Sequence, residues 1–171
     1  MTIPQMAAWA AVTLFPAAMV LAALMDVMTM KIRNRLVLAL MVGYGVLAPL
    51  AGIPWHEMGA SIALAAGVLV VGFSLFAMGW IGGGDAKLAA AAALWLGTAH
   101  VLAFLLYTAL FGGVLTLAIL ALRRVALPAG WNMPEWIRRL HSPQAGVPYG
   151  AAMAPAALMV FPHTPWMAAI L

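Results

Sequence analysis

Charged residues are absent from long stretches of this chain, and these stretches predict helices that cross a membrane. Four of them are plain, at residues 7–25, 36–53, 58–81 and 147–162. Each can hold a membrane helix, which needs roughly 20 apolar residues, or about 17 at the short end. The sequence HTPWMAAIL after the last stretch is expected to lie as a tail at the membrane interface.

A fifth uncharged stretch, from Leu88 to Leu122, is too long for one crossing. As a single straight helix it would extend about 50 Å, whereas the hydrocarbon core of a bilayer is about 30 Å thick. We therefore predict two helices, at residues 86–97 and 99–122, with a break near the sequence GTAH. The chain then forms one all-α membrane-embedded domain, residues 1–171, with six transmembrane helices.

The basic residues indicate how the six helices are oriented. If the N-terminus is outside, all eight lie on the cytoplasmic side: Lys31, Arg33, Arg35, Lys87, Arg123, Arg124, Arg138 and Arg139. The positive-inside rule favours this arrangement. Five crossings would instead put Lys87 and the Arg123–Arg124 pair on opposite faces. Residues 123–146 become a cytoplasmic loop, in which NMPEWIRRLHS predicts a short helix on the membrane surface.

The composition agrees with a multi-pass membrane protein. Of the residues, 67% are hydrophobic and 7% are charged, whereas about a quarter of the residues in a soluble domain are charged. The net charge of +4 reflects the basic clusters between helices and does not indicate nucleic-acid binding. The absence of cysteine excludes a cysteine nucleophile. The histidines are not clustered, so we expect neither a metal ion nor another cofactor.

Two of the four acidic residues are expected to meet. Asp26 ends the first helix and Asp85 begins the fourth, so the predicted topology brings both to the cytoplasmic face. An acidic side chain in a membrane helix costs roughly 2.5–3.5 kcal/mol on insertion scales, and such residues tend to mark functional sites. The alternative is that each aspartate only reaches the membrane surface, paired with Lys31 or Lys87.

Two carboxyl groups that face one water can hydrolyse a peptide bond without a metal. The ionised group takes a proton from the water and the protonated group gives one to the carbonyl oxygen, because adjacent carboxylates resist ionising together. Directly before Asp85 stand Gly82, Gly83 and Gly84. Since they lack a β-carbon, they are expected to unwind the end of the third helix and let a substrate approach. Otherwise they only end that helix.

Three segments resemble the motifs of the type IV prepilin peptidases. The first is the GxGD signature, which Gly82, Gly84 and Asp85 match. The second is DVMTMKIRN, which starts at Asp26 and in which Arg33 replaces the usual proline. The third is VPYGAAMAPAAL in the last predicted helix, which is similar to the family's last span. Pro148, Tyr149 and Gly150 are the residues that match.

The resemblance implies an aspartic endopeptidase that cuts the leader peptide of prepilins at the cytoplasmic face of the bacterial inner membrane. Asp26 and Asp85 would be the catalytic pair. The residues expected to bind substrate or support the pair are Gly82, Gly83, Gly84, Lys31, Asn34, Lys87 and Tyr149. Asn34 is expected to cap the second helix, and Tyr149 either forms a hydrogen bond near the site or anchors the interface.

By the resemblance, larger family members carry a cytoplasmic loop with paired CxxC motifs and also methylate the new N-terminus. This chain has neither the cysteines nor the space for that loop, so we expect no methyltransfer. It therefore resembles the compact branch that serves tight-adherence (Flp) pili. The expected partners are a prepilin or pseudopilin substrate and the lipid bilayer, and homo-oligomerisation is left open. A presenilin-like protease shares the GxGD element, but here the first acid follows methionine rather than tyrosine and no clear PAL motif is present.

Two other classes of protein fit part of the pattern. A small proton-coupled transporter would use the two aspartates as proton carriers, but its acids would lie nearer the bilayer midplane and its sequence would often show paired halves. A non-enzymatic assembly subunit of a pilus or secretion machine would need no paired aspartates.

Overall fold

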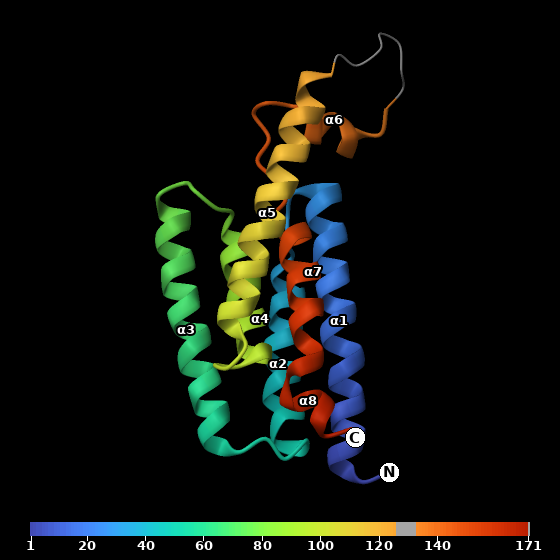
Figure 1. The fold of residues 1–171 in the computed structure, drawn as a ribbon, viewed down its shortest axis with the longest axis vertical. Helices are drawn as coiled ribbons and strands as arrows, with labels where there is room; N and C mark the ends of the chain where they lie inside the picture. Colours follow the sequence, from blue (N-terminus) through green and yellow to red (C-terminus); the bar gives the residue numbers. More distant parts are fainter. Residues whose placement is uncertain (126–132, 171) are drawn as a thin grey trace.

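The computed structural model describes residues 1–125 and 133–170, and across these residues the secondary structure is helical, without strands. The elements are α1 (Ile3–Thr29), α2 (Asn34–Leu50), α3 (Trp55–Ala77), α4 (Gly83–Leu96), α5 (Val101–Arg124), α6 (Glu135–His141), α7 (Gly150–Val160), the 3₁₀ turn η1 (Phe161–His163) and α8 (Pro165–Ala168). The helices α1 to α5 run alternately up and down (Figure 1). The prediction of an all-helical fold is confirmed.

Three helices, α1, α3 and α5, are long and apolar enough to cross a membrane. Helix α2 and the segment from α7 through η1 are apolar but shorter, and α4 has 14 residues. The lengths and compositions therefore suggest a membrane protein. Six crossings and an outside N-terminus stay predictions.

The predicted break between the fourth and fifth helices is present. Helix α4 ends at Leu96 and α5 begins at Val101. Gly97 directly follows α4 with φ 72°, a left-handed conformation that residues with a β-carbon rarely adopt. A glycine at this position thus stops α4 and lets the chain reverse.

The glycine stretch is arranged differently from the prediction. Helix α3 ends at Ala77, and Gly79, with φ 75°, lies in the turn that follows. Gly82 comes immediately before α4, and the next two glycines belong to the first turn of α4. The expectation that Gly82–Gly84 unwind the end of the third helix is therefore wrong, because that helix has already ended.

The tail after Pro162, which we expect at the membrane interface, packs against the bundle through η1 and α8. Trp166 is only 1% exposed, and its ring centroid lies 4.9 Å from that of Trp95 in α4. Aromatic surface of this size is more stable against another ring than at a water-facing boundary.

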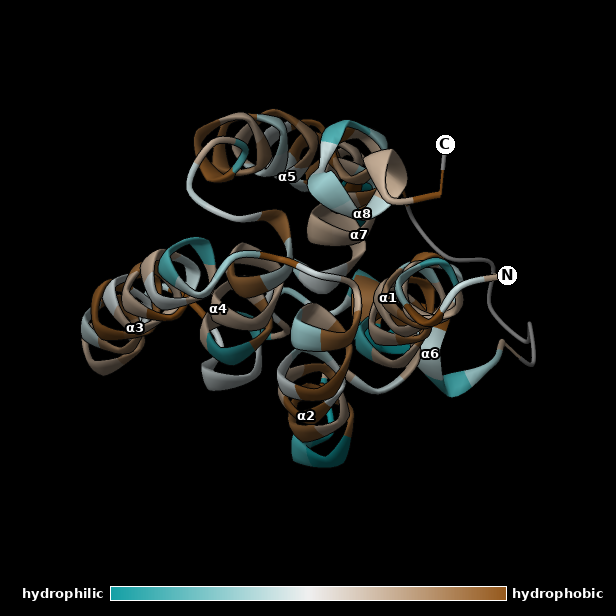
Figure 2. Cartoon of the chain, turned by 90° about the horizontal axis from the view of Figure 1, so that it is seen from below, coloured by the Kyte–Doolittle hydropathy of each residue, from teal (hydrophilic) through white to brown (hydrophobic). Residues whose placement is uncertain are grey.

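The core lies among α1, α2, α4 and α7, with α4 at its centre. Every residue from Ala90 to Leu96 is buried. Helix α3 lies at the edge of the bundle beside α4 (Figure 2). The two approach closely at Gly72, where an added β-carbon would lie 3.0 Å from the β-carbon of Ala86.

The segments that carry the basic residues share one end of the molecule. At this end α1 passes into α2, α4 begins, α5 ends and α6 lies (Figure 1). The N-terminus and α8 lie toward the opposite end. The structure therefore puts Asp26, near the end of α1, and Asp85, near the start of α4, at the basic end.

Candidate active site

Asp26 lies in the last turn of α1 and is 5% exposed. Its Oδ2 accepts a hydrogen bond of 2.7 Å from the backbone N–H of Gly150. Gly150 is the first residue of α7, so its N–H has no partner within that helix. The carboxyl group uses this donor, at a helix end whose dipole favours negative charge.

Gly150 fits against Asp26 with no room for a side chain. A β-carbon on Gly150 would lie 2.9 Å from Oδ2 of Asp26 and 3.0 Å from its β-carbon. Contacts this short would separate α7 from α1. Gly150 belongs to the third motif of the sequence, but sequence reasoning gave it no role. The sequence feature that could have identified Gly150 is its place in the motif at the start of the last predicted helix.

Asp85 lies in the first turn of α4 and is partly buried. Its Oδ2 accepts a hydrogen bond of 3.2 Å from the N–H of Gly82. The same carboxyl group lies close enough to Asp26 for their charges to interact. The fold therefore brings two aspartates that are far apart in the sequence near each other, and the start of α7 binds one of them.

The glycines before Asp85 allow neighbouring segments to pack closely. A β-carbon on Gly84 would lie 3.2 Å from that of Ile32, a buried residue between α1 and α2. A β-carbon on Gly83 would lie 3.3 Å from the ring of Phe76. Gly84 therefore helps the start of α4 to lie against the segment that follows Asp26.

Asn34 and Lys87 form a polar link beside the aspartates. The Lys87 Nζ donates a hydrogen bond of 3.1 Å to Oδ1 of Asn34, which ties α4 to the start of α2. The expectation that Asn34 caps the second helix is wrong, because Arg33 holds the cap position and Asn34 is the first helical residue. Lys31 is exposed.

The alternative in which lysines neutralise the aspartates has no ion pair to support it. In residues 1–125 and 133–170, the ion pairs within 4.0 Å are His56–Glu57 and Arg139–Glu135. Neither aspartate takes part in them. The hydrogen-bond partners of the two carboxyl groups are instead backbone N–H groups.

Tyr149 contacts α5 rather than the aspartates. Its ring packs against Gly112, where an added β-carbon would lie 2.9 Å from Cε1 of the tyrosine. Because Tyr149 directly precedes Gly150, this contact helps to set where α7 begins. The tyrosine therefore supports the site through the backbone that follows it.

The model of the type IV leader peptidase family matches residues 13–117. The chain belongs to this family. The family implies a peptidase that acts on prepilin substrates. No curated protein and no solved structure matches the chain.

The matched range of this leader peptidase contains both aspartates and the glycine stretch, but it ends before α7. The hydrogen bond from Gly150 to Asp26 is therefore an observation of the structure that the match does not supply. It links the matched helices to a part of the chain outside them.

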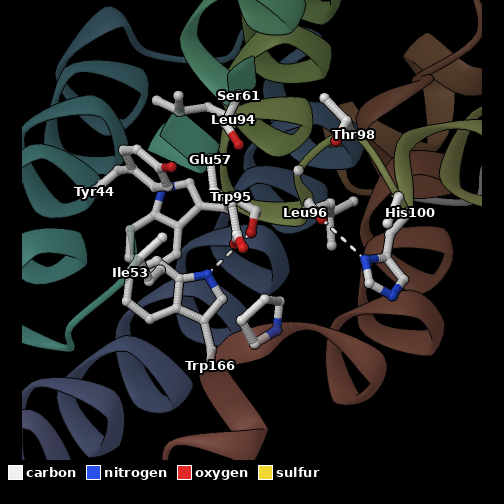
Figure 3. Close-up of a pocket in the computed structure, with 13 residues that line it drawn as sticks. Tyr44, Ile53, Glu57, Ser61, Leu94, Trp95, Leu96, Thr98, His100 and Trp166 are labelled. Atoms are coloured by element: carbon white, nitrogen blue, oxygen red, sulfur yellow. Dashed lines mark hydrogen bonds between the residues drawn. The ribbon is translucent and has the colours of Figure 1, made fainter. Parts of the chain in front are cut away.

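The peptidase also has a cavity of about 370 Å³ away from the aspartates (Figure 3). Tyr44, Trp95 and Trp166 are among the residues that line it, together with the polar side chains of Glu57 and His100. Neither aspartate lines it. The aspartates thus lie at helix ends, and this cavity belongs to another part of the bundle.

Proposed function

We propose that this leader peptidase is an aspartic endopeptidase in which Asp26 and Asp85 are the catalytic pair. The observation that carries the proposal is that the first turn of α4, which carries Asp85, packs against the segment that follows Asp26, while the N–H of Gly150 holds Asp26. Two acids so arranged can share one proton and one water, as in other aspartic proteases. The pair would then titrate as a unit.

The reaction returns the pair to its starting state. The ionised carboxylate takes a proton from water while the water oxygen bonds to the scissile carbonyl carbon, and the protonated carboxyl gives its proton to the carbonyl oxygen. The carboxyl that received the water proton then passes it to the amide nitrogen. The other carboxyl takes a proton from one hydroxyl of the intermediate as the C–N bond breaks.

The backbone donors leave one oxygen of each carboxyl group for this chemistry. Oδ2 of Asp26 accepts from Gly150, and Oδ2 of Asp85 accepts from Gly82. Oδ1 of each aspartate would face the water. Fixing both carboxyl groups in advance is how an enzyme lowers the entropic part of its barrier.

The position of the pair supports a peptidase rather than a proton-coupled transporter. Asp26 is in the last turn of α1 and Asp85 is in the first turn of α4, so both lie at helix ends. Carriers of protons across a membrane usually lie deeper in the bundle, near the bilayer midplane.

We propose that the site lies at the cytoplasmic face of the bacterial inner membrane, with six crossings and the N-terminus outside. The shared end of the eight Lys and Arg residues supports this orientation. The substrate would be a prepilin of the tight-adherence (Flp) type, cut after its short leader. Its scissile bond would have to be extended, since a helical peptide bond is shielded by its own hydrogen bonds.

The test is co-expression with a tight-adherence prepilin, comparing the wild type with Asp26→Asn and Asp85→Asn. Asparagine keeps the size and polarity but cannot cycle a proton, so each variant should cleave at least about 100-fold more slowly. Glu57→Gln, a change at an acid away from the pair, is the matched control and should cleave normally. Full processing by either asparagine variant, inserted at the wild-type level, would refute the catalytic pair.

A further inference from the structure

Arg123, in the last turn of α5, binds the backbone of a distant segment. Its Nε donates to the carbonyl oxygen of Leu140 at 2.9 Å. Its Nη2 donates to the carbonyl oxygens of Ala145 at 2.7 Å and Gly146 at 3.1 Å. Hydrogen bonds from a charged donor are stronger than neutral ones, so this side chain fixes three points of the backbone.

The segment held by Arg123 leads directly to the aspartate pair. Leu140 lies in α6, and residues 142–149, which connect α6 to α7, form no helix. Gly146 comes shortly before Gly150, whose N–H donates to Asp26. The position of this donor therefore depends on how the connection is held.

Helix α5 holds the connection at two places. At one place the guanidinium of Arg123 binds Ala145 and Gly146. At the other the ring of Tyr149 packs against Gly112. Gly150 directly follows Tyr149 in the chain. Helix α5 thus determines where α7 begins, although Arg123 itself forms its hydrogen bonds with the connection and not with the aspartates.

We propose that Arg123 is a positioning residue for peptide-bond cleavage: it holds the α6–α7 connection so that the Gly150 N–H reaches Asp26. This proposal rests on the proposed function of the aspartate pair. Misplacing a group at a reacting centre by about 1 Å can cost about 100-fold in rate. Arginine suits this role because its planar fork of donors binds several carbonyls at fixed angles, which an ammonium group cannot copy.

Arg124 provides a matched control. It has the same side chain at the neighbouring position, it is exposed, and it forms no side-chain hydrogen bond to any other described residue. Replacing either arginine by lysine keeps the positive charge on which membrane orientation depends. A difference between Arg123→Lys and Arg124→Lys therefore reports the hydrogen bonds and not the charge.

The first measurement is the steady-state cleavage of a prepilin by the full-length variants in detergent. Arg123→Lys should lower kcat about tenfold or more and leave KM within about twofold, because the reacting geometry changes and substrate binding does not. Arg124→Lys should match the wild type. Equal kcat values for the two variants would overturn the proposal, as would a loss confined to KM.

The second measurement does not require activity. Hydrogen exchange of the peptide covering residues 142–152 should be faster in Arg123→Lys than in the wild type and in Arg124→Lys. Arg123→Gln, a second variant, should show the same local increase. Unchanged exchange in both Arg123 variants would overturn the proposal even if cleavage fell. If the wild type cleaves no prepilin, the proposed function fails. The hydrogen-exchange rates of residues 142–152 still show in that case whether Arg123 holds the connection.

Discussion

The aspartate site and the aromatic cluster, which consists of Phe15, Tyr44, Trp95, Phe161 and Trp166, hold the bundle together by different means. At the basic end, Asp26 in α1 accepts a hydrogen bond from the N–H of Gly150 in α7. The two helices approach so closely there that a β-carbon on Gly150 would not fit. In the cluster, Trp95 packs against Phe15 with ring centroids 5.4 Å apart and against Trp166 at 4.9 Å. The first contact depends on the positions of a few polar atoms and the second on buried area.

Helix α4 joins these two regions. It carries Asp85 in its first turn and Trp95 near its last residue. The Trp95 Nε1 donates to the carbonyl oxygen of Leu40 at 2.9 Å, so this end of the helix is also fixed by a buried hydrogen bond. The two regions therefore have different roles. The aromatic cluster stabilises α4, and the helix delivers Asp85 to the site.

Outside the aspartate pair, the largest effect on cleavage is expected from Gly150→Ala. The new methyl group would meet Asp26 at 2.9–3.0 Å and shift the N–H that holds its carboxyl group. We expect kcat/KM for a prepilin to fall about 10- to 100-fold, while overpacking lowers stability by about 1–3 kcal/mol. Cleavage rates per folded molecule measure the first effect and thermal unfolding in detergent measures the second.

Gly146→Ala is the control for this substitution. Gly146 lies in the same connection, but nothing lies within 4 Å of the position of an added β-carbon. It should cleave at the wild-type rate. Equal losses in the two alanine variants would mean that any change to the backbone of the connection lowers the cleavage rate, and that the contact with Asp26 is not the cause.

The next prediction concerns the stability that the aromatic cluster provides. Trp166→Ala removes a ring that is 1% exposed and should lower the free energy of unfolding by about 3–5 kcal/mol. The cleavage rate per folded molecule should stay within about twofold of the wild type, as expected for a residue distant from the site. Trp55→Ala, at a residue 76% exposed, should change stability by less than about 0.5 kcal/mol. A large loss of rate in folded Trp166→Ala would break the division between the two regions.

The smallest effect is expected at the polar link between α2 and α4. Lys87→Ala removes the exposed hydrogen bond to Asn34, which should lower stability by less than about 1 kcal/mol and change cleavage by about two- to threefold at most. Asn34→Ala should have the same effect, and the double variant should be no worse than either single one. Additive losses in the double variant would show that the two side chains act separately.

Features that depend on local sequence were predictable. The break at Gly97 follows from a stretch too long for one crossing, and the helix-end positions of Asp26 and Asp85 follow from the spacing of charges along the chain. These properties need no knowledge of which helices are neighbours. They were enough to choose the two aspartates as the candidate pair.

Features that depend on the partner in space were not predictable. Glycines before an acid are consistent with an unwound helix, but Gly84 instead packs against Ile32. A short aromatic tail has the same pattern at an interface as in a core, so the burial of Trp166 could not be foreseen. The donor role of Gly150 requires knowing where α7 begins relative to α1.

The most direct test of the account is whether the side chains at positions 26 and 85 lie next to each other in the membrane. The native chain has no cysteine, so the double variant Asp26→Cys/Asp85→Cys introduces a unique pair. In membranes, a short bifunctional thiol reagent should join the two sulfurs within the chain, because two carboxyl groups that share one water have oxygens within about 6 Å of each other. The pair Asp26→Cys/Glu57→Cys should not be joined. Absence of the 26–85 cross-link under conditions in which both cysteines react with a monofunctional reagent, or equal cross-linking of both pairs, would contradict the account.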